Sequence, residues 1–226
     1  MKRSIKKVAI LGSGVMGSRI ACHFAGIGVN VLLLDMVPKE AVESTKPQER
    51  NKLVNDALQA ALKSNPSPVY TKATAKKITT GNFDDNLSEI AGVDWIIEVV
   101  VENLDIKKKV YDQVEQFRKP GTLITSNTSG IPIHLMAEGR SEEFKKHFCG
   151  THFFNPPRYL RLLEIIPTPD TDPEIVDFLM HYGDQLLGKT TVLCKDTPAF
   201  IANRVGVYSI MALLHLVEKM DLKVEE

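Results

Sequence analysis

The stretch AILGSGVMGS, residues 9–18, carries three glycines in the spacing Gly12-x-Gly14-x-x-Gly17. It follows an apolar run and opens a segment with helical periodicity. In this pattern the first glycine permits a tight turn, the second lets a pyrophosphate approach the backbone, and the third lets helix and strand pack closely. The helix N-terminus then offers free amides and the positive end of its dipole to the phosphates. The stretch therefore predicts a dinucleotide site at the end of the first strand.

The residues around this motif supply the context that a glycine pattern alone lacks. We expect a buried strand over 7–11, a helix over 15–28 and a second strand over 29–35. Asp35 ends that second strand, 18 residues after Gly17. An acid at this place accepts the ribose hydroxyls and repels a 2′-phosphate, so it favours NAD over NADP. A glycine-rich turn beside a surface aspartate is the weaker interpretation, because strand, spacing and acid agree.

The rest of the chain alternates apolar runs with longer helical segments, as parallel α/β proteins do. The prediction is an α/β, Rossmann-type, doubly wound and mostly parallel sheet. Further strands are expected over 76–81, 93–100, 121–129, 148–154, 161–168 and 189–195, and further helices over 103–118 and 172–188. The polar, lysine-rich stretch 38–68 is too long for an ordinary crossover. We predict a helical arm there, broken at Pro47, that projects from the sheet.

Composition excludes several classes of protein. Of the 226 residues, 28 are lysine or arginine and 28 are aspartate or glutamate, so no net charge draws the chain to nucleic acid or to a membrane surface. No stretch of the sequence is long enough to span a bilayer. The three cysteines, Cys22, Cys149 and Cys194, are odd in number and lack CxxC spacing. We therefore expect no disulfide framework, no metal site and a cytoplasmic location.

A second candidate site lies in THFFNPP, residues 151–157. The local string leaves two roles open for His152: a buried core histidine, or the base of an active site. Oxidising an alcohol to a ketone requires a base for the hydroxyl proton, and the ordinary histidine pKa of about 6.5 suits that task. Glu164 follows 12 residues later, in the next expected strand. A hairpin between the two strands would let this carboxylate orient the imidazole.

The last segment, 196–220, has the pattern of one long helix. Asp196 or Thr197 can cap it, and Pro198 suits its first turn. Its apolar residues leave little polar face, and a helix that is apolar nearly all round is expected to be buried. Because little sequence follows it, we expect either that another subunit covers this helix or that the chain is a piece of a longer protein.

Five strings, in order along the chain, resemble the L-3-hydroxyacyl-CoA dehydrogenase family. They are AILGSGVMG, VVVENLDIKKKV, SNTSGIPI, HFFNPPRYLRLLEII and CKDTPAFIANR. The resemblance implies an NAD-dependent dehydrogenase of (3S)-3-hydroxyacyl-CoA thioesters in fatty-acid β-oxidation. It also implies an acyl-CoA substrate, gripped by the arm and by the stretch that follows it.

The same resemblance implies roles for individual residues. His152 is the catalytic base and Glu164 its partner, and Ser129 and Asn203 hydrogen-bond the substrate's 3-oxygen or the histidine. Asn127 lies beside the nicotinamide ribose, while Glu102 and Lys107 line the cofactor cleft. The full set implied to bind the cofactor is Gly12, Gly14, Val15, Met16, Gly17, Asp35, Glu102, Lys107 and Asn127.

The family's architecture implies a division of the chain. Residues 1–195 would form the NAD-binding domain, and 196–226 would begin a helical C-terminal domain that closes the cleft and forms a homodimer. Two departures from the family pattern stand out. Pro157, Arg158 and Tyr159 stand where family members more often carry smaller or apolar residues, and Ala199 stands where glycine is usual.

Two alternative functions remain open at this level. One is a dehydrogenase of free 3-hydroxy acids or sugar acids, against which the long polar arm argues. The other is an NAD-binding fragment that is inactive without further C-terminal helices.

Overall fold

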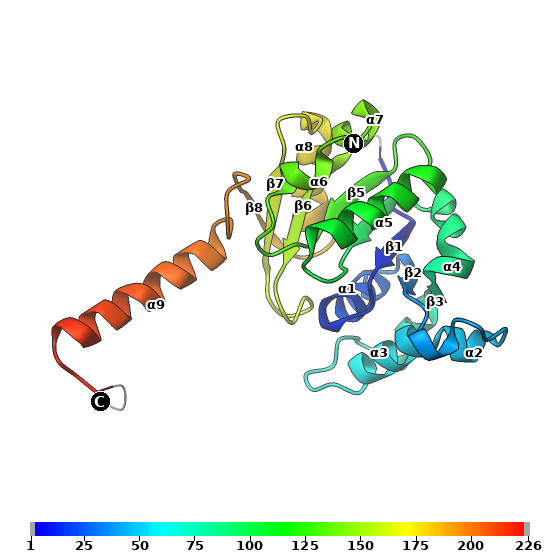
Figure 1. Cartoon of the computed structure of the whole chain (residues 1–226), viewed down its shortest axis with the longest axis horizontal. Helices are drawn as coiled ribbons and strands as arrows, with labels where there is room; N and C mark the ends of the chain where they lie inside the picture. The colour runs from blue at the N-terminus through cyan, green and yellow to red at the C-terminus, as the bar shows by residue number, and fades with distance from the viewer. Residues whose placement is uncertain (1–2, 224–226) are drawn as a thin grey trace.

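The computed structural model describes residues 3–223, and within that range the centre is an eight-stranded sheet (Figure 1). The strand order is β3-β2-β1-β4-β5-β6-β7-β8, and only the β6–β7 pair is antiparallel. The strands are β1 (Lys7–Leu11), β2 (Asn30–Asp35), β3 (Ile78–Asn82), β4 (Trp95–Glu98), β5 (Leu123–Ser126), β6 (Phe148–Phe153), β7 (Leu162–Pro167) and β8 (Thr190–Leu193). This arrangement confirms the predicted Rossmann-type fold.

Helices cover both faces of this sheet. They are α1 (Val15–Gly26), α2 (Pro47–Arg50), α3 (Lys52–Leu62), α4 (Phe83–Asn86), α5 (Leu104–Phe117), α6 (Ile133–Ala137), α7 (Glu142–Lys146) and α8 (Pro173–Gln185). A further helix, α9 (Ala202–Lys219), does not pack on the sheet. Two apolar cores result, because successive residues of a strand point to opposite faces. In β1, Val8 and Ile10 join the core under α1, α3 and α8, while Ala9 and Leu11 join the core under α5 and α6.

The topology brings the two candidate sites to one edge of the sheet. The chain crosses over between β1 and β4, so the loops that follow their carboxyl ends open a crevice there. The β6–β7 hairpin then pairs His152 directly with Glu164. In an antiparallel ladder, directly paired residues point to the same face of the sheet. The predicted juxtaposition of these two side chains is therefore a consequence of register.

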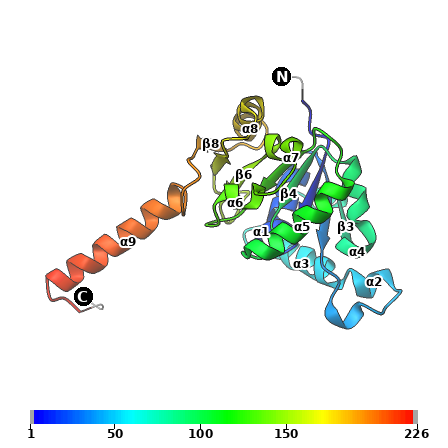
Figure 2. The ribbon, with the colours of Figure 1, turned by 45° about the horizontal axis from the view of Figure 1, so that its top comes forward.

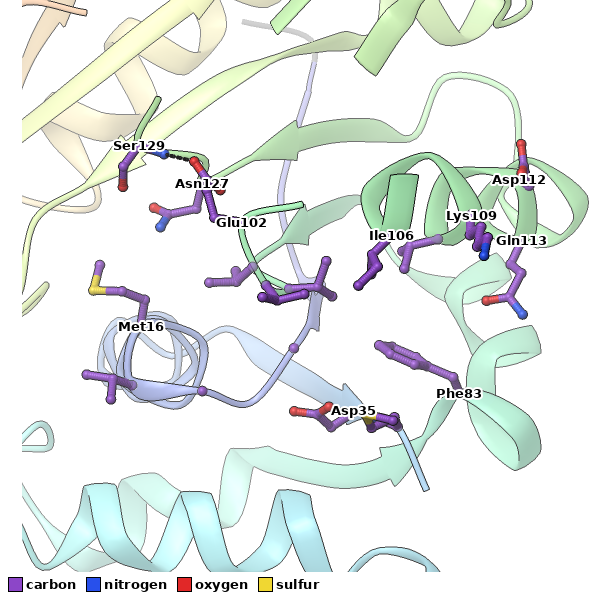
Figure 3. A pocket seen from close by; sticks show the side chains of 18 residues that line it. Met16, Asp35, Phe83, Glu102, Ile106, Lys109, Asp112, Gln113, Asn127 and Ser129 are labelled. Atoms are coloured by element: carbon purple, nitrogen blue, oxygen red, sulfur yellow. Dashed lines mark hydrogen bonds between the residues drawn. The ribbon is translucent and has the colours of Figure 1, made fainter. Parts of the chain in front are cut away.

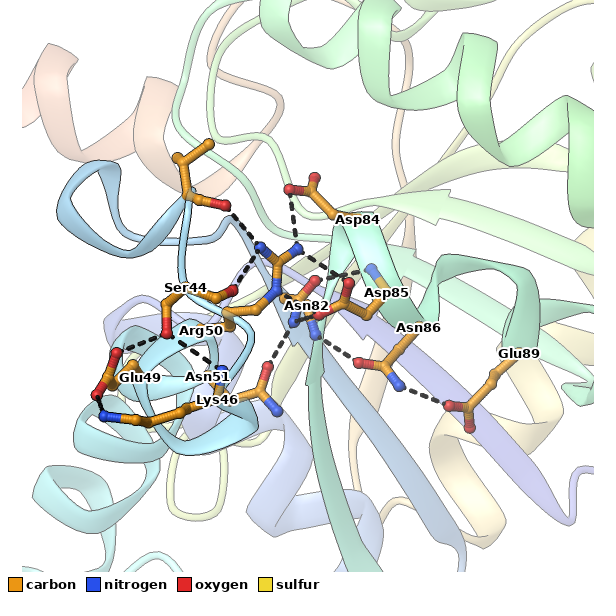
Figure 4. A network of polar contacts seen from close by, with 11 residues as sticks. Ser44, Lys46, Glu49, Arg50, Asn51, Asn82, Asp84, Asp85, Asn86 and Glu89 are labelled. Carbon is orange, nitrogen blue, oxygen red and sulfur yellow. Dashed lines mark hydrogen bonds and ion pairs between the residues drawn. The ribbon is translucent and has the colours of Figure 1, made fainter.

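The arm differs from the expected projecting helix. Pro47 begins the short helix α2, as proline at a first helical position does, and α3 packs onto α1 through buried Val54 and Leu58. An apolar stripe on α3 explains this packing, because burying it removes apolar surface from water. Figure 4 shows what holds the other end of the arm: Arg50 donates to both carboxylate oxygens of Asp85, at 2.7 and 2.9 Å.

The predicted start of the last helix is wrong. Helix α9 begins at Ala202, and Asp196 instead accepts hydrogen bonds from the amides of Ile133 and His134, at the start of α6. Between them the backbone turns through left-handed angles at Ala199 (φ 63°) and Phe200 (φ 49°). The turn carries the Phe200 side chain into the core, where it is 2% exposed. Burial of this ring outweighs the helical preference of the segment.

This turn explains the glycine usual at position 199, and it yields a prediction. A left-handed conformation costs an L-residue roughly 1–2 kcal/mol, which glycine avoids. Glycine loses more conformational entropy on folding, and this loss cancels about 0.5–1 kcal/mol of the gain. We expect Ala199→Gly to raise the free energy of unfolding by about 0.5–1 kcal/mol in urea titrations. Ala60→Gly, in an ordinary turn of α3, should lower it by about 1 kcal/mol. Equal losses in both variants would contradict the expectation.

Helix α9 extends away from the sheet in both views (Figures 1 and 2), and none of its residues is buried. Among residues 3–223, no helix combines the length and apolar character needed to cross a membrane. The proposed division at residues 195 and 196 stays a prediction.

Candidate active site

The glycine turn has three positions with different spatial demands. Gly12 has a φ of 106°, and a Cβ built there would lie 2.6 Å from the carbonyl oxygen of Val99. A Cβ at Gly17 would lie 1.8 Å from the carbonyl oxygen of Gly12. At Gly14 a Cβ would meet no protein atom within 4 Å. The fold itself therefore requires Gly12 and Gly17, whereas the space in front of Gly14 is open for a ligand.

This difference separates folding from binding. Gly17→Ala should lower the free energy of unfolding by more than about 3 kcal/mol, because its methyl group meets backbone that cannot yield. Gly14→Ala should change it by less than about 1 kcal/mol. The same Gly14 methyl occupies the approach to a pyrophosphate, so NADH affinity should fall on the order of tenfold. Urea unfolding and NADH fluorescence titration measure the two effects. Unchanged NADH affinity in Gly14→Ala would place the phosphates elsewhere.

A cleft of about 1090 Å³ opens beside this turn, at the carboxyl ends of the parallel strands (Figure 3). Its lining includes Gly12, Gly14, Val15, Met16, Asp35, Glu102, Asn127 and Ser129. Asp35 stands at the end of β2, where its Oδ2 accepts from the amide and the hydroxyl of Ser13, both at 2.6 Å. The carboxylate is thus fixed next to the glycine turn.

The residues present fit a dinucleotide. No side chain caps the N-terminus of α1 at Gly14, so its first amides are free to meet phosphate oxygens. Asp35 keeps acceptor capacity for a ribose hydroxyl. Within the described chain, no group of three or more His, Cys, Asp or Glu side chains could hold a metal ion.

Glu102 organises the turn that carries Ser129. Its Oε1 accepts from the amide of Ser129 at 2.9 Å (Figure 3). It also accepts from the amide of Gly130 at 3.1 Å and from the hydroxyl of Thr128. Partial burial by itself would raise the pKa of Glu102. The Thr128 hydroxyl, the charge of Lys107 and the two amides outweigh it and lower this pKa. Glu102 is therefore a stable anion at the edge of the cleft.

Lys107 lies beneath the cleft instead of lining it, contrary to the expectation. Its side chain is 1% exposed, and its Nζ lies 2.8 Å from Glu98 Oε1 and 3.3 Å from Glu102 Oε2. Lys107 lies in the first turn of α5, on the buried side of the helix, and reaches Glu98 at the end of β4. Lys107 therefore acts on the cleft through Glu102.

Glu98 is a buried carboxylate that sequence reasoning missed. Besides Lys107, it accepts from Val100 N at 2.7 Å, Tyr111 Oη at 3.0 Å and Ser126 Oγ at 2.6 Å. Burial and the nearby Glu98 charge raise the pKa of Tyr111 far above its ordinary value, so this phenol stays a donor. The sequence feature that could have indicated a buried carboxylate was the single acid in the apolar run WIIEVV. Glu98 ties the ends of β4 and β5 together under the cleft.

His152 and Glu164 form a buried pair on the β6–β7 hairpin. His152 Nδ1 lies 2.8 Å from Glu164 Oε2, and the two residues are 4% and 1% exposed. An ionised carboxylate only accepts hydrogen bonds, so the Nδ1 proton points at Glu164 and the Nε2 lone pair is left free. This arrangement suits a general base.

The remaining predicted residues lie around this pair. Asn127 Oδ1 accepts from the amide of Phe153 at 2.9 Å, which ties the cleft to the strand of His152. Asn203 Nδ2 donates to the carbonyl oxygen of Ser129 at 3.4 Å. Among residues 3–223, neither Ser129 nor Asn203 hydrogen-bonds His152. Their side chains are exposed or half-buried and therefore accessible to a substrate.

A buried lysine, also missed, supports the loop after His152. Lys189 is 2% exposed, and its Nζ donates to the carbonyl oxygens of Pro157 and Leu160. Burial lowers the pKa of Lys189 to about 8. Nothing in its local sequence distinguishes it from a surface lysine, because only the tertiary fold covers it. Burial raises the pKa of the Cys149 thiol to about 12, so this thiol stays protonated at neutral pH.

Fold and site together define a class: a Rossmann-type domain with a dinucleotide cleft and a histidine–carboxylate pair nearby. Residues 7–197 match the family model described as 3-hydroxyacyl-CoA dehydrogenase, NAD binding domain. The chain belongs to this family, as the five strings indicated, and NAD is the cofactor of its cleft.

Individual relatives agree with this assignment. A probable 3-hydroxyacyl-CoA dehydrogenase of Bacillus subtilis is 48% identical, over 100% of this chain and 30% of the relative. One of Deinococcus radiodurans is 45% identical, over 96% of this chain and 61% of the relative. The crystal structure of (S)-3-hydroxybutyryl-CoA dehydrogenase from Ralstonia eutropha has a TM-score of 0.79 and 28% identity, covering 98% of this chain and 75% of that one. The chain thus spans less than two thirds of both curated relatives.

Proposed function

We propose that this chain performs the dehydrogenase reaction on (3S)-3-hydroxyacyl-CoA thioesters, with NAD as the hydride acceptor, in fatty-acid β-oxidation. The observation that supports this proposal most directly is the buried His152–Glu164 pair, whose 2.8 Å contact through Nδ1 leaves Nε2 of His152 free to act as a base. The family membership and the names of the relatives support the same reaction.

The cofactor would be held by residues of the cleft. The turn at Gly12 and Gly14 and the N-terminus of α1 would bind the pyrophosphate, and Asp35 would accept the ribose hydroxyls of its adenosine half. Asn127 would lie toward the nicotinamide half, since it joins the cleft to β6. Bound NAD supplies the hydride acceptor.

Residues of the chain itself carry out the proton transfer. His152 Nε2 takes the proton of the C3 hydroxyl, and Glu164 stabilises the imidazolium that forms. Ser129 and Asn203 would donate to the developing carbonyl oxygen, and their mutual contact at 3.4 Å keeps them on one side of the site. Apolar packing around His152 keeps bulk water from the proton.

The arm and the stretch after it would bind the CoA moiety. The short 3-10 helix Lys72–Lys77 presents Lys72, Lys76 and Lys77 to solvent. Exposed ammonium groups suit the phosphates of coenzyme A. Arg158 and Tyr159 both bond the carbonyl oxygen of Ser67, at 2.7 and 2.9 Å, so the arm is fastened to the loop that follows His152. This contact gives Arg158 and Tyr159, which depart from the family pattern, a structural role.

Comparison of two ketone substrates tests this proposal. We expect NADH oxidation by the chain with acetoacetyl-CoA, and a kcat/KM at least about an order of magnitude lower with free acetoacetate. The reason is that binding energy from the remote CoA part is used at the reacting centre. Spectrophotometry at the NADH absorbance measures both rates.

The other outcomes separate the alternatives. Equal kcat/KM for both substrates would favour a dehydrogenase of free 3-hydroxy acids. NADH binding without turnover would favour an inactive NAD-binding fragment, and a longer chain should then restore activity. Absence of NADH binding would contradict the proposal.

Two wider expectations accompany this function. We place the reaction in the cytoplasm, an expectation supported by the three unpaired, buried cysteines. We also expect the full-length protein to be a homodimer, supported by the exposed apolar residues along α9.

A further inference from the structure

The segment between β8 and α9 is anchored at two points. Asp196 Oδ2 lies 2.6 Å from His134 Nδ1, in addition to the backbone contacts with α6 described above. Four residues later, the left-handed turn delivers Phe200 to the interior. The segment is therefore fixed to the body of the protein immediately before α9 begins.

Phe200 ends next to the imidazole of His152. The two ring centroids are 5.7 Å apart at an interplanar angle of 59°, and Phe154 contacts the same imidazole at 4.4 Å and 56°. Two aromatic rings thus restrict the rotation of the His152 ring. One belongs to the loop after β6, and the other comes from the segment that leads into α9.

Glu164 divides its two oxygens between His152 and α9. Oε2 contacts His152 Nδ1, as above, while Oε1 accepts from the amides of Ile201 at 3.1 Å and Ala202 at 2.8 Å. These amides are among those that a helix start leaves without intrahelical partners. A carboxylate at this place is a strong acceptor, because the helix dipole adds to the two hydrogen bonds. One buried side chain therefore caps α9 and orients the base.

The body of α9 makes little other contact with the chain, since none of its residues is buried. Its link to the sheet runs through Phe200, the two amides on Glu164 and the Asn203–Ser129 contact. We propose that Phe200 and the Ile201 and Ala202 amides position the His152–Glu164 pair, so that the placement of α9 sets the geometry of the base. The consequence for catalysis rests on the function proposed above.

Phe200→Ala tests this coupling, with Tyr208→Ala as a matched control. Tyr208 is an aromatic residue of α9 that is 75% exposed and lies outside the site. The first readout is the His152 Nδ1–H signal in proton NMR of the ¹⁵N-histidine-labelled chain, assigned by its loss in His152→Gln. We expect Phe200→Ala to broaden or shift this signal, and Tyr208→Ala to leave it in place.

The second readout is kinetic. In Phe200→Ala we expect kcat with acetoacetyl-CoA to fall at least about tenfold, because a base displaced from its working geometry transfers protons poorly. The dissociation constant of NADH should stay within about twofold, since Phe200 does not line the cofactor cleft. Phe200→Leu preserves most of the side-chain volume and serves if the alanine variant fails to fold. Its effects should have the same direction.

The outcomes are distinguishable. An unchanged His152 signal in folded Phe200→Ala and Phe200→Leu would overturn the inference, whatever the activity. If the His152 signal shifts in Phe200→Ala but the parent chain shows no turnover, the coupling is upheld and the proposed function is wrong. An equal fall in kcat in Phe200→Ala and Tyr208→Ala would also overturn the inference, because the effect would then belong to α9 in general.

Discussion

Replacing His152 by glutamine should lower kcat for acetoacetyl-CoA reduction by about 10²–10⁴-fold, the usual contribution of a positioned acid or base. Glutamine is close in size and can still hydrogen-bond Glu164, whose oxygen lies 2.8 Å from the native Nδ1. The variant should therefore fold, but it has no group that exchanges a proton at neutral pH. Steady-state rates measured from NADH absorbance check the loss.

Two controls make this result specific. The dissociation constant of NADH should change by less than about threefold in His152→Gln, because the residue lies outside the lining of the cleft. His181→Gln, on the outer part of α8, should retain the parent rate. Retention of full activity in His152→Gln would remove the base from our mechanism. Equal loss in both variants would indicate a general defect.

Lys107→Met should lower the free energy of unfolding by about 3–5 kcal/mol. Glu98 is fully buried, and removing its ammonium partner at 2.8 Å leaves an uncompensated charge in the interior. The bonds from Tyr111 and Ser126 remain, but neutral donors replace a cation only in part. Urea unfolding followed by circular dichroism measures the change.

The neighbouring Lys108 is the matched control. It is a third exposed and forms only a 3.4 Å ion pair with Glu138, so Lys108→Met should cost less than about 1 kcal/mol. The double variant Glu98→Leu/Lys107→Met should recover part of the stability lost in Lys107→Met, because no unpaired charge remains. If Lys107→Met were as stable as Lys108→Met, the buried Glu98–Lys107 pair would contribute nothing measurable to the free energy of unfolding.

Several features of this protein were determined by the sequence alone. The glycine spacing, the strand before it and Asp35 predicted the dinucleotide turn, because that turn depends on local backbone sterics. The alternation of apolar runs and amphipathic segments predicted the parallel sheet. The sequence also predicted a hairpin that would let Glu164 meet His152, and the observed register of β6 and β7 pairs the two residues directly.

Other features were decided only by the tertiary structure. Lys107 and Lys189 have the local sequence of surface lysines, but the fold buries both. Lys107 folds back onto Glu98 of β4, and Lys189 reaches backbone carbonyl oxygens in the loop between β6 and β7. Asp196 caps α6 instead of the helix that follows it in sequence, and α9 starts at Ala202 because the Phe200 ring is buried beside His152. Burial and charge pairing depend on contacts between residues far apart in the chain. A local pattern contains no information on those contacts, and their energies exceed the local preferences that pattern reasoning uses.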